Sequence, residues 1–376
     1  MKVLHASDFH LDSPLSGLPP EKSALRRREL REIPARLAKL AKDEGADLVL
    51  LPGDLFDGAR VYPETVHALA RALGDMAVPV FIAPGNHDYY HDRSPYALTD
   101  WPDNVYIFTQ PGLQGVELPA LNCVVHGSAF TAPHREDDPL SGFTVPDDGR
   151  LHLLCAHGEV GVAGNYAPID PKSLEHSGAA YAALGHVHAN HSGRAGKTLW
   201  AYPGCPEGRG FDELGPKGAL IVAFDEPAQL SITSPDGPPM APIGLGVRPV
   251  AAKFVPVCQR QYRIETVSVD DFTSTLPQGE SPDLARFLLS GESRFAPDLD
   301  ALAAQASPRF FHVELQDRTT LPTDLWARAE EDSLTGLFLR EMRARLDSAD
   351  ESEKDKLLLA ARFGLAALEG GEDVRP

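Results

Sequence analysis

The chain is poor in cysteine, with four among its 376 residues: Cys123, Cys155, Cys205 and Cys258. They lie far apart and form no Cys-x-x-Cys pair, so neither a disulfide framework nor a thiolate zinc site is expected. The sequence also lacks an apolar stretch approaching the roughly 18 residues that a membrane-spanning helix needs. No charged-then-apolar leader opens the chain, which begins Met-Lys-Val-Leu-His. We therefore expect reduced thiols, a cytoplasmic protein and no membrane partner.

Basic residues are outnumbered, because 35 Lys and Arg face 54 Asp and Glu and the net charge is −19. This balance argues against a broadly basic surface for nucleic acid. A DNA substrate would need local Lys and Arg, bound metal ions or a partner subunit for its contacts. The basic run Arg26–Arg28, with Arg31, Arg36 and Lys39, is one local feature that could face DNA. A solvated helix face is the simpler interpretation.

Apolar patterning predicts strands that alternate with helices in the first part of the chain. Strands are expected at residues 2–7, 47–51 and 78–83, and helices at 21–44, broken near Pro34, and at 63–76. Shorter strand-like runs at 122–130, 151–156, 180–184, 198–202 and 219–224 suggest a second sheet. Functional groups lie just past the strand ends, as in α/β layered folds.

The second part of the chain has a different pattern. Residues 226–249 are rich in Pro and Gly and are interpreted as a connection, followed by strands near 251–257 and 261–269. Helical runs are then expected at 283–289, 299–305, 333–346 and 353–368, with one strand at 310–315. We predict two domains, residues 1–270 with the functional groups and residues 271–376 as a small α/β cap.

Five short blocks carry side chains that bind hard divalent ions. In chain order they are Asp8-Phe9-His10, Gly53-Asp54, Gly85-Asn86-His87-Asp88, Ala156-His157-Gly158 and Gly185-His186-Val187-His188. Side chains two residues apart on an extended segment can face one side, as Asp8 and His10 would. The two oxygens of Asp54 can bridge two ions roughly 3.5–4 Å apart. Oxygen and imidazole ligands without thiolate suit a pair of divalent ions that activate water against a phosphate ester.

Each predicted side chain has a predicted role. One ion would be held by Asp8, His10, Asp54 and His188, and the other by Asp54, Asn86, His157 and His186. His87 would stabilise the transition state or protonate the leaving oxygen. Asp57 either orients His87 or caps a turn. Asp88 is expected to be a structural orienter.

A second motif is discounted. Residues 191–198 read His-Ser-Gly-Arg-Ala-Gly-Lys-Thr and lack the first glycine of a nucleotide P-loop. They also fall where a strand-to-strand turn is expected, whereas a P-loop joins a strand to a helix. No ATP site is expected there.

With the five blocks in place, the chain resembles the calcineurin-like metallophosphoesterases, and within them the SbcD/YhaO group of DNA-repair exonuclease subunits. The resemblance covers residues 1–225 and is faint beyond 260. The stretches that carry it, besides the ligand blocks, are His5–Pro14, Gly53–Asp57, Asn165–Pro168, Ala183–His188, Tyr202–Gly204 and Gly208–Gly215.

The resemblance implies a two-sheet sandwich flanked by helices (α/β/β/α), two Mn²⁺ ions and phosphodiester cleavage. The family's ligand positions match Asp8, His10, Asp54, Asn86, His157, His186 and His188. Its catalytic histidine matches His87, whereas some relatives have histidine where this chain has Asp57. Pairing with an SbcC-like SMC-type ATPase and homodimer formation are also implied.

Three functional hypotheses follow. The first is an Mn²⁺-dependent DNA nuclease in DNA repair, acting on single- or double-stranded DNA. The second keeps the metal chemistry for small phosphoesters or cyclic nucleotides, and the acidic composition favours it. The third is a scaffold subunit that is active only with an SMC-type ATPase.

Overall fold

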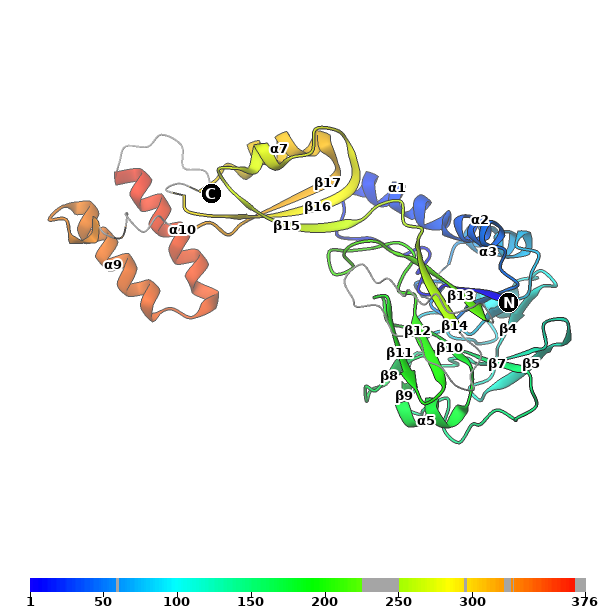
Figure 1. Cartoon of the computed structure of the whole chain (residues 1–376). Helices are drawn as coiled ribbons and strands as arrows, with labels where there is room; N and C mark the ends of the chain where they lie inside the picture. The colour runs from blue at the N-terminus through cyan, green and yellow to red at the C-terminus, as the bar shows by residue number, and fades with distance from the viewer. Residues whose placement is uncertain (59–60, 225–249, 294–295, 321–325, 327, 369–376) are drawn as a thin grey trace. The chain divides into compact units, whose positions relative to one another are not determined.

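The computed structural model describes residues 1–58, 61–224, 250–293, 296–320, 326 and 328–368 (Figure 1). The chain forms two compact units, residues 1–259 and 260–376. The predicted connection at 226–249 lies outside the described residues. The boundary falls earlier than the predicted residue 270, because strand β15 (Tyr262–Ser268) pairs with β16 (Ser281–Ser290) of the second unit.

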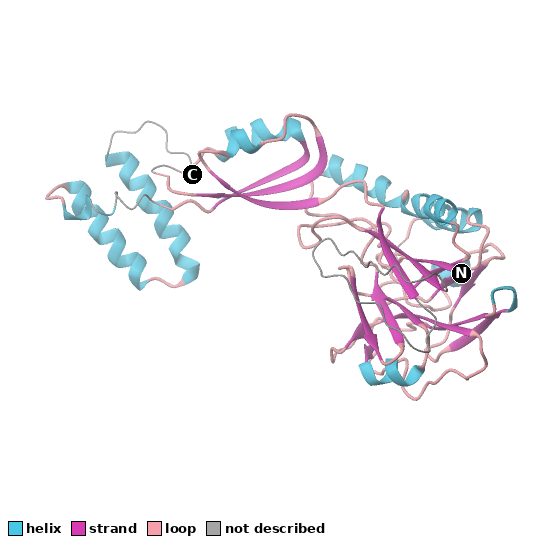
Figure 2. Ribbon diagram, in the orientation of Figure 1, coloured by secondary structure: helices cyan, strands magenta, loops and turns pink. Residues whose placement is uncertain are grey.

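Two six-stranded sheets form the first unit (Figure 2). In the first sheet, β1 (Lys2–His5), β2 (Leu48–Leu51), β3 (Val80–Ile82) and β4 (Val105–Ile107) are parallel, and β13 (Gly218–Phe224) and β14 (Val250–Pro256) extend it antiparallel. In the second, β6 (Cys123–Ser128), β7 (Leu151–His157), β10 (Tyr181–Gly185) and β12 (Thr198–Tyr202) are parallel, and β5 (Gln114–Leu118) and β11 (His191–Ala195) form antiparallel edges. A small parallel pair joins β8 (Glu159–Val160) to β9 (Pro168–Ile169).

The helices of the first unit are α1 (Pro20–Arg31), α2 (Ile33–Glu44), α3 (Pro63–Asp75), α4 (Pro95–Leu98) and α5 (Pro171–Ser177), with a 3₁₀ turn η1 (Pro119–Leu121). The predicted break in the first helical run is confirmed, since Glu32 ends α1 and caps α2. Pro34 lies in the first turn of α2, where a missing N–H costs no hydrogen bond.

Alternating side chains of the strands explain the layers. Val3 packs between the two sheets while Leu4 packs under the helices, and Leu48 and Val49 divide in the same way. The core under α1–α3 therefore lies on the outer face of the first sheet, and a third core under α5 covers the second. The predicted α/β/β/α sandwich is confirmed.

The second unit contains a three-stranded parallel sheet of β15, β16 and β17 (Phe310–Asp317), with α6 (Phe272–Thr275), α7 (Leu299–Ala306) and η2 (Ser307–Arg309). It also contains η3 (Arg328–Glu330), α9 (Leu334–Ser348) and α10 (Glu351–Leu368). The helix predicted at 283–289 is wrong, because these residues form the central strand β16. Ala285, Phe287 and Leu289 alternate into the core of this unit, but Leu284 and Leu288 on the other face are also apolar, so the sequence lacks the period of two that marks a half-exposed strand.

Arg26 belongs to the basic run that we interpreted as a DNA-facing or a solvated helix face, and neither interpretation holds for it. Its side chain is fully buried in α1, and Nη1 donates to Glu29 Oε2 at 2.6 Å and to Glu207 Oε1 at 3.1 Å. Arg36 Nη2 donates to the other oxygen of Glu207 at 2.8 Å. These arginines therefore tie the helices to the chain near residue 207, and their charges are already compensated.

One other expectation is met. The P-loop lookalike forms the β11–β12 hairpin, so it is a strand-to-strand turn as predicted. Among the described residues, every helix is too short or too polar to cross a bilayer.

His5 makes the stability of this fold depend on pH. The Tyr181 hydroxyl donates to Nδ1 at 2.8 Å, and Nε2 donates to the Leu184 carbonyl at 3.1 Å, as a neutral ring requires. Burial lowers the pKa of His5 from 6.5 to about 3. Below pH 6.5 the unfolded chain therefore binds a proton that the folded chain excludes. As a result, the free energy of unfolding is highest above pH 6.5 and decreases as the pH falls from 6.5 to 3.

We expect His5 to lower the free energy of unfolding by at most about 1.4 kcal/mol for each pH unit in that window. His5→Gln should remove this dependence. Urea unfolding of both proteins across the window, with EDTA present so that metal binding does not contribute, measures the difference. If the free energy of unfolding changes equally with pH in both proteins, His5 is not the group responsible.

Candidate metal centre

The predicted side chains follow five parallel strands. Asp8 and His10 follow β1, Asp54 and Asp57 follow β2, Asn86 and His87 follow β3, His157 ends β7, and His186 and His188 follow β10. Parallel strands direct their carboxyl ends to one edge of a sheet, and here both sheets present that edge to the same place. Residues spread over 181 positions, from Asp8 to His188, therefore meet at one site.

Backbone geometry at this edge is unusual. Asp8, His10, Asp54 and His186 all have positive φ, at 57°, 45°, 52° and 104°. Such values are costly for residues with a Cβ and concentrate at functional sites. The loops after β2 and β3 also lie very close together. A Cβ added to Gly85 would lie 2.3 Å from Asp54 Oδ1, which is too close for any side chain. Glycine at position 85 therefore lets the β2 and β3 loops approach each other.

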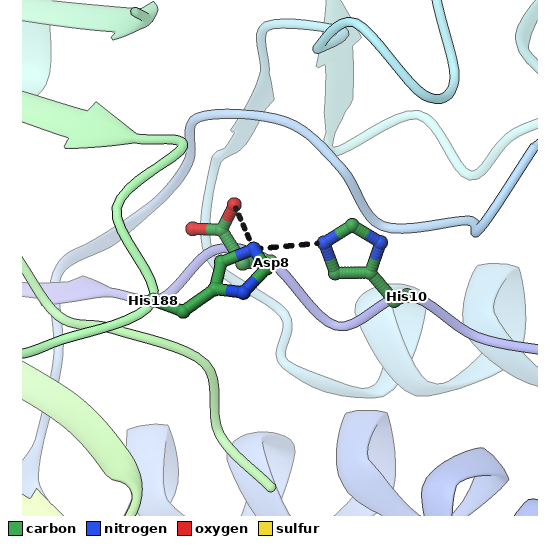
Figure 3. A group of neighbouring side chains, drawn as sticks. All are labelled: Asp8, His10 and His188. Atoms are coloured by element: carbon green, nitrogen blue, oxygen red, sulfur yellow. Dashed lines mark hydrogen bonds and ion pairs between the residues drawn. The ribbon is translucent and has the colours of Figure 1, made fainter. Parts of the chain in front are cut away.

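One cluster comprises Asp8, His10 and His188 (Figure 3). The two Nε2 atoms of His10 and His188 lie 3.1 Å apart, and His188 Nε2 lies 3.7 Å from Asp8 Oδ1. Each ring donates its Nδ1–H to a carboxylate, His10 to Asp57 at 2.9 Å and His188 to Glu213 at 2.7 Å. The lone pairs of both Nε2 atoms then point to the same position. A cation bound there would replace their mutual repulsion with attraction.

A second cluster comprises Asp8, Asp54 and His157, with Asn86 beside them. His157 Nε2 lies 3.3 Å from Asp54 Oδ2 and 3.0 Å from Asn86 Oδ1, while Nδ1 bonds the Pro52 carbonyl at 2.9 Å. Burial lowers the pKa of His157, but the charge of Asp54 outweighs it and raises the pKa to about 9. The site thus favours a positive charge at Nε2, and its oxygen and imidazole donors fit divalent ions.

His186 is placed differently from the other predicted ligands. Its backbone N–H donates to Asp8 Oδ1 at 3.0 Å, and its ring centroid lies 5.2 Å from that of His157. Burial lowers the pKa of His186 to about 4, so the ring is neutral and able to bind a metal. Its ring atoms do not belong to the clusters above, and its role as a ligand stays a prediction.

Asp57 lies closer to His10 than to His87. Its Oδ1 is 2.9 Å from His10 Nδ1 and 3.9 Å from His87 Nδ1. Asp57 therefore orients His10, whereas we predicted that it would orient His87 or cap a turn. The ring of His87 packs edge-on against His10 at 4.8 Å, and its backbone N–H donates to Asp54 Oδ1 at 2.9 Å.

Asp88 holds the backbone of two loops. Its carboxylate accepts N–H bonds from Gly85, Asp54, Leu55 and Phe56 and the hydroxyl of Tyr96. Burial raises the pKa of Asp88, and the charge of Asp54 adds to this. The carboxylate thus serves as the structural orienter that we expected.

Sequence reasoning missed Arg209 and Glu213. Arg209 Nη1 donates to Asp57 Oδ1 at 3.3 Å and Nη2 donates to Glu213 Oε1 at 2.8 Å, so it joins the two carboxylates that orient His10 and His188. Burial would raise the pKa of Glu213, but its bonds to His188 and Arg209 lower it well below the usual range. The one available signal was the stretch Gly208–Gly215, for which no role was predicted.

Two mixed sheets between helices, with potential metal ligands gathered at their shared edge, define a metal-dependent phosphoesterase. The chain belongs to the calcineurin-like phosphoesterase family, whose model matches residues 1–190.

Three relatives are similar to this chain. It is 29% identical over 238 residues to the uncharacterized metallophosphoesterase YhaO of Bacillus subtilis (strain 168), covering 59% of this chain and 57% of that protein. It is 29% identical over 238 residues to the DNA double-strand break repair protein Mre11 of Aeropyrum pernix, covering 58% and 57%. It is 23% identical over 269 residues to SbcD of the nuclease SbcCD from Bacillus subtilis, covering 61% and 67%. The matches to the first two relatives thus span little more than half of their length.

Proposed function

We propose that this protein is an Mn²⁺-dependent DNA nuclease with two divalent ions, acting in DNA repair. The observation that carries the proposal is the convergence of the imidazoles of His10, His188 and His157 on two carboxylates, Asp8 and Asp54. A double-strand break repair protein and a nuclease component among the relatives support DNA as the substrate.

The residues of the site would have three roles, as metal ligands, as groups that orient the ligands and as a proton donor. Asp8, His10, Asp54 and His188 would hold one ion, and Asp54, Asn86, His157 and His186 the other. When bound, such ions polarise a phosphoryl oxygen and lower the pKa of water. Asp57, Glu213 and Arg209 keep each Nδ1 proton on the outer side of its ring, so that Nε2 stays available. His87 is exposed enough to reach a substrate, and it donates a proton to the leaving oxygen.

Partners would supply the contacts that the acidic chain lacks. With a net charge of −19 and Arg26 and Arg36 already paired, its own basic groups offer little attraction for a phosphate backbone. We propose an SbcC-like SMC-type ATPase as the partner, a homodimer as the assembly, and the cytoplasm as the location. The first unit would act as the nuclease domain and the second as an accessory cap, with the boundary at residue 260 in place of the predicted 270.

A second candidate is a phosphodiesterase for small phosphoesters or cyclic nucleotides. The acidic composition favours it, because a small substrate needs no basic track along the surface.

Nucleotide release from end-labelled linear DNA tests the proposal. We expect release from single- or double-stranded DNA with Mn²⁺ and none with EDTA, since the ligands alone supply no Lewis acid. Hydrolysis of a cyclic nucleotide and of a generic phosphodiester in the same buffer serves as the comparison. Hydrolysis of these small compounds without release from DNA would contradict the nuclease proposal, unless release begins when the ATPase partner is added.

A further inference from the structure

An exposed aromatic ring lies next to the metal centre. Tyr166 belongs to the loop between β8 and β9, and 39% of its surface is exposed. Its ring centroid lies 5.2 Å from that of His186 at an interplanar angle of 34°. The ring centroid of His134 lies 5.6 Å from that of Tyr166. Tyr166 therefore lies beside His186, whose ring packs in turn against the predicted ligand His157.

Tyr166 also lines a hollow of about 310 Å³, formed by residues 162–166 with Glu159 and Pro168. This volume is at the lower end of the range for small-ligand sites. The lining is chiefly small and apolar, and it adds the amide of Asn165 and the carboxylate of Glu159. A flat, uncharged ring at the wall of such a hollow suits another flat ring.

The base of the loop is held in place. The Arg135 N–H donates to the Asn165 carbonyl at 2.8 Å, and the Ala167 N–H donates to the Arg135 carbonyl at 2.7 Å. The Tyr202 hydroxyl donates to the Gly158 carbonyl at 2.8 Å and accepts the Val160 N–H at 3.0 Å. These bonds fix both strands that lead to Tyr166, so its ring is presented from a supported position.

We propose that Tyr166 is a stacking platform for a nucleobase of the substrate, and that the hollow beside it receives the rest of that nucleoside. The proposal rests on the proposed function, because the phosphate joined to this nucleoside would lie at the metal centre. Base stacking needs no charge and tolerates any base, so it suits an acidic protein that binds DNA without sequence preference. It would also favour nucleotides over simple phosphoesters.

Nucleotide release from single-stranded DNA by Tyr166→Leu, Tyr166→Phe and wild type tests the platform. The Leu variant should raise KM on the order of tenfold with little change in kcat, and the Phe variant should behave as wild type because it keeps the ring. Tyr106→Leu is the matched control, since Tyr106 is also 39% exposed and stacks on Phe81 in the first sheet. Equal melting temperatures would establish that all variants are folded.

A substrate lacking one base makes the test specific. An abasic nucleotide at the terminal or the next position, at either DNA end, should raise KM for wild type by a similar factor at one of these positions. The same abasic substrate should cause no further loss in Tyr166→Leu, since the two changes remove one contact. The platform would be overturned if the abasic substrate raised KM in Tyr166→Leu by the same factor as in wild type, or if it raised KM in neither protein.

Failure of the nuclease proposal is seen separately, as no release of nucleotides by wild type. Fluorescence anisotropy of a labelled oligonucleotide with EDTA then decides the inference. Binding about tenfold weaker in Tyr166→Leu, and unchanged in Tyr166→Phe and Tyr106→Leu, would support stacking. Equal binding by all four proteins would overturn it.

Discussion

His87→Ala is expected to lower kcat for phosphodiester hydrolysis by about 10²–10⁴-fold, the usual contribution of a general acid or base. The side chain of His87 is 45% exposed, whereas the rings of His10 and His157 are buried around the carboxylates. A ring at the mouth of the site can meet a leaving oxygen that the buried rings cannot reach. Because all seven predicted ligands remain, metal binding should be preserved.

Steady-state kinetics with elemental analysis of bound metal measures both parts of this result. His91→Ala is the matched control, because His91 lies in the same loop region, four residues later, and bonds the backbone N–H of Arg93. That variant should stay within about twofold of wild type, as expected for a change away from the site. Unchanged kcat in His87→Ala would remove the residue from the mechanism. Loss of metal together with activity would instead make it a ligand, consistent with its closeness to His10 and Asp54.

Asp54→Ala should abolish hydrolysis and remove metal ions from the protein. Its carboxylate could share an ion with Asp8 and His157 or with His10 and His87, and Oδ2 lies 3.3 Å from His157 Nε2 and 3.8 Å from His10 Nε2. Without it, the ligand that both ions are predicted to share is lost, and His10 and His157 lose the carboxylate that lies between them. We expect kcat/KM to fall on the order of a thousandfold or more, at least the effect of losing one electrostatic group at a reaction centre.

Thermal melting with and without Mn²⁺ provides the second measurement. Ligands that bind only the folded state raise the melting temperature, so wild type should melt higher with Mn²⁺ and Asp54→Ala should show little change. Asp75→Ala, at the exposed end of α3, should shift as wild type does. A full Mn²⁺-dependent shift in Asp54→Ala would show that this carboxylate is dispensable for binding.

The sandwich was predictable because its signals are local. Strands such as Leu48–Leu51 are short apolar runs between turn residues, and helices such as Pro63–Asp75 repeat apolar residues at helical spacing. The predicted ligands were visible for a related reason. Each lies at the end of a strand, and parallel strands bring their ends together whatever the distance along the chain.

Local signals misled where apolar residues occupy both faces of a strand. Residues 283–289 include Leu, Ala and Phe without alternation in the sequence, which suits a helix as well as a strand, although within the strand only Ala285, Phe287 and Leu289 belong to the core of this unit. Only its pairing with β15 and β17 makes it a strand, and the same pairing moves the unit boundary ahead of Tyr262.

By itself the sequence determined the ligand types, their order and the layers that carry them, because these depend on residue chemistry and short-range periodicity. The tertiary structure alone decided which group orients which. Asp57 bonds His10, Glu213 bonds His188, and Arg209 joins Glu213 to Asp57, which lies 152 residues before Arg209 in the chain. It also buried Arg26 against Glu207 and set Tyr166 beside His186. Such contacts join residues that no local pattern relates, so they exist only once the two sheets have packed.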